Sequence, residues 1–273
     1  MDEKKDVPFL EFSEVTLNIP DDELPFVSIN IPCYKRRKFC PLMITNIQFL
    51  DYPKDKLEIV ILQDGPESLF ITSDHKKLFE ECIHPAKLKY VYEPNIRRSI
   101  GDKRNRLVKL SSHKIIANID SDDIYFPQYL RHSINAMKQY KVGITSSAAM
   151  LFLYPHLDFK LTGIRCGMKF QGHEACSVFT KKHFNAMGGF GKTSQGEGTK
   201  MIHYNEKNMV NLDIAQLMIC VAHNNDDEGN TIGKDQFLDA ILPNGGEFNP
   251  ESPHIMCVKH ILGLVPVPTT TTN

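Results

Sequence analysis

A membrane-spanning helix needs about 18 consecutive apolar residues, and the sequence has no run of that length. The nearest candidate, residues 212–222, is short and contains Asp213 and Gln216. The first residues, MDEKKDVPFLEFSE, are acidic and lack the apolar core of a secretory signal peptide. We therefore expect a soluble, cytoplasmic protein with no membrane span.

An excess of charge of either sign is also missing. The chain has 32 lysines and arginines against 33 aspartates and glutamates, which gives a net charge of -1. A chain of this balance has no overall attraction to nucleic acid or to anionic lipid. Nucleic acid is therefore not an expected partner.

Paired cysteine motifs are missing as well. The seven cysteines are scattered, odd in number and never arranged as CxxC. Neither a disulfide framework nor a cysteine zinc site is expected, and a reducing compartment fits better. No internal repeat is found in the 273 residues, which are enough for one large α/β domain or two small ones.

Short apolar strands alternate with helices in the first half of the chain. Strands are predicted at residues 26–31, 57–62, 88–92 and 115–119, and helices at 39–50, 74–82 and 99–110. This alternation predicts an α/β fold with a mostly parallel central sheet and helices on both faces. Ligands of such sheets bind at the carboxyl ends of the strands.

The pattern is less regular beyond Pro127. Helices are predicted at residues 128–139 and 181–187, β-prone stretches at 142–154 and 157–180, and a glycine-rich loop at 188–198. The pattern of residues 205–222 is compatible with either a helix or a strand. From Asn224 on, the composition is loop-like. Residues 1–24 are expected to form an extended lead-in, and residues 265–273 a disordered tail.

The most informative stretch is KIIANIDSDD, residues 114–123. Its isoleucines indicate a buried strand, which leads directly into Asp120, Ser121, Asp122 and Asp123. Three carboxylates this close repel one another and are costly to desolvate without a cation. Oxygen ligands at this spacing suit Mg²⁺ or Mn²⁺, especially when phosphates supply further ligands. The alternative is an acidic surface turn that caps the helix beginning near Pro127.

Further polar residues are expected at the same edge of the sheet. Pro32–Tyr34 and Asp64 end two other predicted strands, so they should meet the acidic residues in one crevice. Lys103 and Arg104, near the start of a predicted helix, would add cationic donors and a favourable helix dipole. The alternative for these two cations is a solvated helix face.

Five motifs together resemble the glycosyltransferases of family 2, nucleotide-sugar-dependent enzymes of the GT-A fold. They are VSINIPCY (27–34), VILQDG (60–65), GDKRNRLV (101–108), NIDSDD (118–123) and GGFG…GEG (188–198). The resemblance covers about residues 25–225. It implies a single GT-A catalytic domain at 25–264, in which 25–123 bind the nucleotide sugar and 124–264 the acceptor.

The resemblance also implies roles for individual residues. The expected donor-binding residues are Pro32, Cys33, Tyr34, Asp64, Lys103, Arg104, Asp120 and Ser121. Asp122 would hold Mn²⁺ or Mg²⁺ on the diphosphate, with Asp120 and His223 as further ligands. Glu197 matches the acid that serves as base in inverting members. The alternatives are a surface histidine for His223 and an exposed loop glutamate for Glu197.

The sequence departs from the family pattern in four places. Cys33 stands where Thr or Ser is usual, Lys35 where Asn is usual, and Gln63-Asp64-Gly65 where Asp-Asp-Gly is usual. Glu197-Gly198 replaces an acidic pair. These departures leave the expected fold unchanged but weaken any transfer of donor specificity.

Two other motifs are set aside. Residues 188–193, GGFGKT, end like a phosphate-binding loop, but they follow a predicted helix instead of a strand and lack the first required glycine. His173-Glu174 has no second histidine at the spacing of a zinc protease, so a structural role is expected for it.

The leading prediction is a metal-dependent glycosyltransferase, with inversion, that uses a UDP-sugar donor and a glycan, protein or small-molecule hydroxyl acceptor. A sugar-phosphate nucleotidyltransferase is one alternative, although the sequence lacks the Gly-rich, basic N-terminal loop that a triphosphate needs. The other alternative is a non-catalytic sugar-nucleotide or glycan-binding module.

Overall fold

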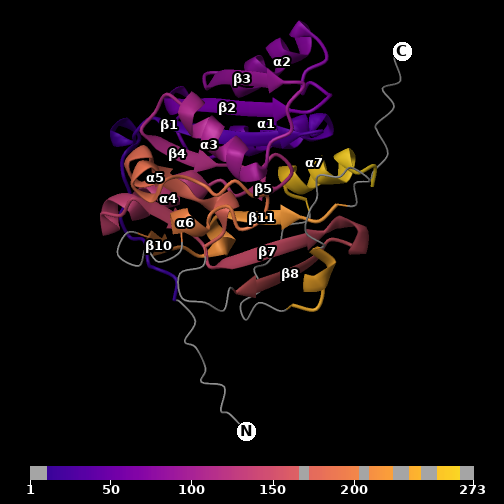
Figure 1. The fold of residues 1–273 in the computed structure, drawn as a ribbon. Coiled ribbons are helices and arrows are strands. Elements are labelled where there is room, and N and C mark those ends of the chain that lie inside the picture. Colours follow the sequence, from indigo (N-terminus) through magenta and orange to yellow (C-terminus); the bar gives the residue numbers. More distant parts are fainter. Residues whose placement is uncertain (1–10, 166–171, 203–208, 224–233, 241–250, 265–273) are drawn as a thin grey trace.

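The computed structural model describes residues 11–165, 172–202, 209–223, 234–240 and 251–264 (Figure 1). Its centre is a seven-stranded sheet of order β10-β6-β9-β4-β1-β2-β3. The strands are β1 (Val27–Tyr34), β2 (Leu57–Asp64), β3 (Lys87–Glu93), β4 (Ile115–Asn118), β6 (Ile144–Ser146), β9 (Val178–Thr180) and β10 (Met209–Asn211). All neighbours pair in parallel except β9, which runs antiparallel to both β4 and β6. The expected mostly parallel sheet is confirmed.

The first two strands are longer than predicted and bring their polar ends together. All eight residues of β2 are buried, as the continuous apolar pattern requires for a central strand. Strand β1 was expected to end at Ile31, but it continues through Pro32 to Tyr34, which pairs with Asp64. Pro32 is tolerated there because β4 pairs with β1 only as far as Asn30, so the proline lies where one neighbour has already ended.

Helices flank this sheet. They are α1 (Cys40–Phe49), α2 (Ser73–Ile83), α3 (Ile100–Leu110), α4 (Tyr129–Tyr140), α5 (Lys181–Met187), α6 (Thr199–Ile202) and α7 (Pro253–Ile261). Helix α3 packs on β1 and β2, and the hydroxyl of Ser99 caps it by accepting the N–H of Asp102. Helix α7 was missed, although Ser252-Pro253 is a normal helix start and the Ser252 hydroxyl accepts the N–H of Ile255. Within the described ranges, no helix combines the length and the apolar character needed to cross a membrane.

A second sheet of four strands lies beside the first, in the order β5-β11-β7-β8. It contains β5 (Ile124–Tyr125), β7 (Ala149–Tyr154), β8 (Lys160–Arg165) and β11 (Met218–Val221). The β-prone stretch 142–154 is therefore divided between the two sheets. The division falls at Ala148, whose N–H is bound by the side-chain oxygen of Asn211 at 2.7 Å. The ambiguous stretch 205–222 contributes two strands, β10 and β11.

The described part of the lead-in packs along α4 and contains a 3₁₀ turn at Asp21–Glu23. The side chain of Gln139 accepts the N–H groups of Thr16 and Leu17, and Asn135 accepts that of Ile19. Residues 1–10, most of the glycine-rich connection at 167–172 and the predicted tail at 265–273 lie outside the described residues.

One prediction concerns the amino ends of the strands, where Glu58 links β2 to Ser28 of β1 and to Ser112, which precedes β4. Its carboxylate accepts the Ser28 hydroxyl at 2.5 Å, the Ser112 N–H at 2.8 Å and the Ser112 hydroxyl at 2.7 Å. Burial alone would raise the pKa of Glu58, but these donors outweigh burial and lower the pKa below its ordinary 4.5. We expect Glu58→Gln to reduce the free energy of unfolding at neutral pH by about 2 kcal/mol.

The difference in the free energy of unfolding between the wild-type protein and Glu58→Gln should also depend on pH. Because the folded-state pKa is depressed, the stabilisation is fully present above the unfolded-state pKa and is lost as the pH falls through the folded-state pKa. Urea unfolding of both proteins should therefore give a difference in the free energy of unfolding that becomes smaller below pH 4.5. Glu80→Gln, on the exposed face of α2, is the matched control. A difference between the wild-type protein and Glu58→Gln that does not change with pH would contradict the role of the Glu58 carboxylate.

Candidate active site

A cavity of about 480 Å³ opens at the carboxyl ends of β1 and β4. Eight of the predicted site residues line it: Pro32, Tyr34, Lys103, Arg104, Asp120, Ser121, Asp122 and Glu197. They come from two strand ends, from α3 and from the glycine-rich loop. The predicted convergence of these segments is therefore present in the structure. Cys33, Asp64 and His223 are not among the residues that line the cavity.

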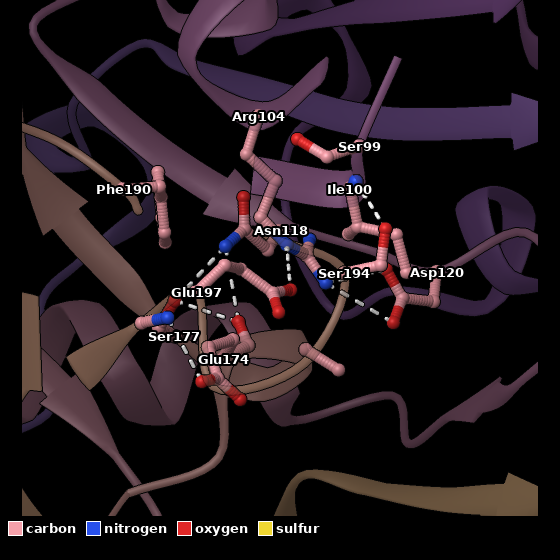
Figure 2. Close-up of polar contacts among 12 residues, drawn as sticks. Ser99, Ile100, Arg104, Asn118, Asp120, Glu174, Ser177, Phe190, Ser194 and Glu197 are labelled. Atoms are coloured by element: carbon pink, nitrogen blue, oxygen red, sulfur yellow. Dashed lines mark hydrogen bonds and ion pairs between the residues drawn. The ribbon is translucent and has the colours of Figure 1, made fainter. Parts of the chain in front are cut away.

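Arg104 is the central cation of this cavity (Figure 2). Its side chain is buried, with Nη2 at 3.0 Å from Asp120 Oδ1 and Nε at 3.2 Å from Glu197 Oε1. Burial by itself would lower the pKa of Arg104, but the charges of Asp120 and Glu197 outweigh it and raise the pKa. Glu197 is only 5% exposed, so the alternative of an exposed loop glutamate is wrong. The alternative of a solvated helix face is also wrong for Lys103 and Arg104, which are 4% and 2% exposed.

Lys103, which lines the cavity, forms an ion pair with Asp64, which does not. The ammonium group of Lys103 lies 2.5 Å from Asp64 Oδ1 and donates to the carbonyl of Cys33 at 3.0 Å. The other oxygen, Asp64 Oδ2, accepts the N–H of Arg98 at 2.7 Å, and Asp64 is fully buried. Burial lowers the pKa of Lys103 although Asp64 opposes this effect. Asp64 is thus not placed to meet a nucleobase in this arrangement.

The first motif presents its residues alternately to the cavity and to the core. The side chain of Cys33 belongs to the hydrophobic core, and burial raises its pKa to about 12. Cys33 therefore does not line the expected base pocket with its side chain, because strand alternation turns it away from Pro32 and Tyr34. The ring of Tyr34 lines the cavity, and the guanidinium of Arg97 lies 3.3 Å from its centroid.

Each carboxylate of the acidic cluster faces a basic side chain of the protein itself. Asp120 pairs with Arg104, and Asp122 Oδ2 accepts from Arg36 Nε at 3.0 Å. Asp123 Oδ1 accepts the N–H of Val221 at 2.9 Å and lies 3.8 Å from the ammonium of Lys234. The cluster is therefore neither a surface turn nor a helix cap, since Asp123 is buried and α4 has no side-chain cap.

Burial and charge move the pKa values of two of these aspartates in opposite directions. Burial would raise the pKa of Asp122, but Arg36 and His223 outweigh it and hold the pKa well below its usual range. For Asp123, burial raises the pKa to about 7; Lys234 opposes this shift, and the charges of Asp122 and Asp120 add to it. Both aspartates line the cavity, and of these two Asp122 is the one that stays ionised.

Asp122 and His223 are the residues that fit a divalent cation. Their Oδ2 and Nε2 atoms lie 2.9 Å apart, so one ion could contact both. Mg²⁺ and related ions commonly take only one or two carboxylates from the protein and complete their shell with phosphates and water. Among the described residues, no three His, Cys, Asp or Glu side chains are grouped as a metal site, and Asp120 is turned toward Arg104. A cation at these two residues would therefore need further ligands from outside the protein, such as phosphate oxygens and water.

The glycine-rich loop covers the start of α3. Gly101 donates its N–H to the carbonyl of Thr193 at 2.9 Å, and Ile100 donates to the Ser194 hydroxyl at 3.2 Å. These contacts occupy the first N–H groups of α3 in the observed arrangement. The favourable contribution of the helix dipole to anion binding stays a prediction. The loop follows α5, which agrees with setting the phosphate-loop motif aside.

Several residues of the cavity were not anticipated. Arg36, Arg97, Arg98 and Lys234 add positive charge, and His173 and Glu174 line the wall beside the loop. A purely structural role for His173-Glu174 is therefore too narrow. Burial lowers the pKa of His173 to about 4, so its ring is neutral, and Nδ1 accepts the N–H of Ala175. No local motif marks these positions, because they reach the cavity only through the tertiary fold.

Comparisons with known proteins agree with this architecture. The profile of the family described as Glycosyl transferase family 2 matches residues 28–188. An uncharacterized glycosyltransferase of Rickettsia bellii (strain RML369-C) is 28% identical over 113 residues, which are 41% of this chain and 15% of that protein. The UDP-forming cellulose synthase catalytic subunit of Pseudomonas fluorescens (strain SBW25) is 26% identical over 126 residues, which are 46% and 16%. The chain thus matches only a small part of each of these curated relatives.

Solved structures share the fold. The mannosyltransferase PcManGT from Pyrobaculum calidifontis, in complex with GDP-Man and Mn²⁺, gives a TM-score of 0.54 at 20% identity, covering 79% of this chain and 62% of that one. TarS 1–349 of S. aureus with UDP-GlcNAc gives 0.54 at 12% identity, covering 76% and 61%. At these identities the likeness concerns the GT-A fold alone.

The contact between the loop and α3 generates a second prediction. A Cβ atom on Gly101 would lie 1.7 Å from the carbonyl oxygen of Gly191, so the backbones must separate if Gly101 becomes alanine. We expect Gly101→Ala to lower the free energy of unfolding by about 1–3 kcal/mol and to raise hydrogen exchange in residues 191–198. Gly191→Ala is the control, because its Cβ would meet nothing closer than 3.5 Å. Equal effects of the two substitutions would show that close packing at Gly101 is not what holds the loop.

Proposed function

The chain belongs to glycosyl transferase family 2, and we propose that it transfers a sugar from a nucleotide-diphosphate donor to a hydroxyl acceptor. The observation that carries this proposal is the arrangement of one cavity. The ionised carboxylate Asp122, its basic neighbours Arg36 and Lys234, and the carboxylates of Glu174 and Glu197 all line this cavity. Sugar transfer needs both a site for a leaving diphosphate and an acid–base group for the acceptor.

The donor would bind against the ends of β1 and β4. Tyr34, on whose ring Arg97 is stacked, would contact the nucleobase. Asp120 and Ser121, which line the same cavity, would contact the ribose. The Nη1 atom of Arg104 is buried and has no hydrogen-bond partner among the described residues, so it can donate to an oxygen of the bound donor. A UDP-sugar remains the proposed donor. PcManGT was solved with GDP-Man and TarS with UDP-GlcNAc, which supports the broader class of nucleotide sugars.

The proposed cofactor is Mn²⁺ or Mg²⁺, held by Asp122 and His223. When bound, the ion neutralises the negative charge that the diphosphate gains as it leaves. The guanidinium of Arg36 and the ammonium of Lys234 lie beside the same acidic cluster and add positive charge in this part of the cavity. We propose that these two cations hold the diphosphate in place while Asp120 stays engaged with Arg104.

The acceptor would enter from the side of the second sheet. Met150 and Phe152 of β7 line the cavity, together with Gln195 of the glycine-rich loop and Thr199 of α6. A glycan, a protein side chain or a small molecule could supply the hydroxyl group. We propose that this hydroxyl attacks the face of the sugar opposite the diphosphate, which inverts the anomeric centre.

The substitution Asp122→Asn tests the donor and metal part of the proposal. A panel of UDP-glucose, UDP-GlcNAc and GDP-mannose would be scored by thermal unfolding and by nucleoside diphosphate release, with Mn²⁺ or with EDTA. A donor at 100 times its Kd should stabilise the wild-type protein by about 2.7 kcal/mol. We expect the Mn²⁺-dependent part of this stabilisation, and of donor turnover, to disappear in Asp122→Asn because the ion loses its carboxylate ligand.

Asp213→Asn, at a turn outside the cavity, serves as the control. An unchanged response to Mn²⁺ in Asp122→Asn would remove Asp122 as a ligand. Binding of a donor without any turnover would favour a non-catalytic binding module. Release of pyrophosphate from a nucleoside triphosphate and a sugar phosphate would favour a nucleotidyltransferase.

A further inference from the structure

We propose that Glu174, and not the loop residue Glu197, is the carboxylate that accepts the proton from the acceptor hydroxyl. This inference rests on the proposed glycosyl transfer and assigns a residue that the sequence motifs did not single out. It follows from how the two carboxylates are held, from the backbone that positions Glu174, and from the absence of a side chain at Gly198.

Glu197 is committed to Arg104. Its Oε1 atom lies 3.2 Å from Arg104 Nε, and both side chains are almost fully buried. If Glu197 became protonated, the buried guanidinium would keep Asp120 as its only charged partner, and breaking a buried ion pair in this way is costly. Burial raises the pKa of Glu197 although Arg104 opposes this shift. The ion pair nevertheless suits Glu197 to fixing Arg104 in position, because a proton on Glu197 would break it.

Glu174 is held differently. Its Oε1 atom accepts the N–H of Gly198 at 2.9 Å, and no described residue donates to Oε2. The side chain is half-buried and lines the cavity. One carboxylate oxygen is thus fixed by the protein while the other remains able to accept a proton from a ligand, as a general base requires.

The backbone at Glu174 is rigidly placed beside the acidic cluster. Residues Glu174–Cys176 form the 3₁₀ turn η5, and the carbonyl of Glu174 accepts from Asn118 Nδ2 at 3.0 Å and from the Ser177 hydroxyl at 2.8 Å. Asn118 is the last residue of β4 and precedes Asp120 by two positions. Figure 2 shows Asn118, Ser177 and Glu174 together below Arg104. A catalytic group needs such support to keep its reactive atom in place.

Gly198 provides the space that Glu174 fills. A Cβ atom at position 198 would lie 2.1 Å from Glu174 Cγ and 2.7 Å from its Oε1. The side chain of Glu174 therefore occupies the volume in which a side chain from position 198 would begin. A side chain at position 198 and the side chain of Glu174 cannot occupy this volume together. Because position 198 is glycine, the volume is filled by the carboxylate side chain of Glu174.

The step is a single displacement. The acceptor oxygen forms a bond to the anomeric carbon, the bond from that carbon to the diphosphate oxygen breaks, and the diphosphate leaves with the electron pair. The proton of the acceptor hydroxyl moves to Glu174 Oε2. With water in place of the acceptor, the same step gives the free sugar.

The first test is donor hydrolysis by Glu174→Ala, using the nucleotide sugar of the panel that the wild-type protein consumes. We expect the rate to fall by about 100-fold or more, because general base catalysis is lost. The stabilisation of the protein by the donor should not change. Azide has no proton to lose, so Glu174→Ala should form glycosyl azide at the wild-type rate, a result that mere structural damage would not produce.

Glu197→Gln is the matched comparison. It disturbs the position of Arg104, so we expect it to slow hydrolysis and azide transfer alike. The double variant Glu174→Ala/Gly198→Asp offers a second readout, since removal of the Glu174 side chain frees the space for an aspartate from position 198. We expect this variant to hydrolyse the donor about tenfold faster than Glu174→Ala, because a base is restored in the same place.

The outcomes separate this inference from the proposed function. Hydrolysis at the wild-type rate in Glu174→Ala, or azide rescue of Glu197→Gln in place of Glu174→Ala, would overturn the assignment of Glu174 and leave glycosyl transfer intact. If the wild-type protein neither binds nor hydrolyses any nucleotide sugar of the panel, the proposed function itself fails and the assignment fails with it.

Discussion

The double ion pair of Arg104 is the interaction on which the site depends. The guanidinium of Arg104 is only 2% exposed, and Asp120 and Glu197 compensate its buried charge. Loss of one partner from a buried pair typically costs about 3–5 kcal/mol, since the remaining charge stays desolvated. The pair also has a geometric effect. Through Arg104 of α3, it joins Asp120, which follows β4, to Glu197 in the glycine-rich loop. These three segments of the cavity lining are thereby held together.

The same principle recurs throughout the cavity. Lys103 is matched by Asp64, Asp122 by Arg36 and Asp123 by Lys234, so the acidic cluster does not depend on a metal ion for its neutrality. The physical argument for a metal from three adjacent carboxylates alone is therefore weaker than the sequence implied. The support for a divalent ion comes instead from the short distance between Asp122 and His223 and from the charge of a leaving diphosphate.

The sequence predicted the framework of the molecule well because its strands are short apolar runs that end in polar residues. The strand before Asp120 and the convergence of the ends of β1 and β4 needed only hydrophobic patterning and the rule for parallel sheets. Arg36, Lys234 and Glu174 could not be found in this way, since each is an ordinary polar residue until the fold brings it to the cavity. The inward side chain of Cys33 was missed for a local reason. The strand was expected to end before Pro32, so its alternation was not extended to the next residue. The contact between Gly198 and Glu174 depends on packing between two loops, on which hydrophobic periodicity carries no information.

The place of β9 in the sheet has a consequence for how the chain folds. Strand β9 lies between β4 and β6, although it is made after both of them, and it pairs antiparallel with each. Until residues 178–180 are available, β4 is an edge strand with unpaired backbone groups on one side, which is the form in which strands associate with other chains. The segments that complete the cavity, the turn at Glu174 and the loop at Glu197, flank this same strand. Closing the sheet and assembling the site are thus one late event, so a partly synthesised chain carries the acidic cluster without the cavity that surrounds it.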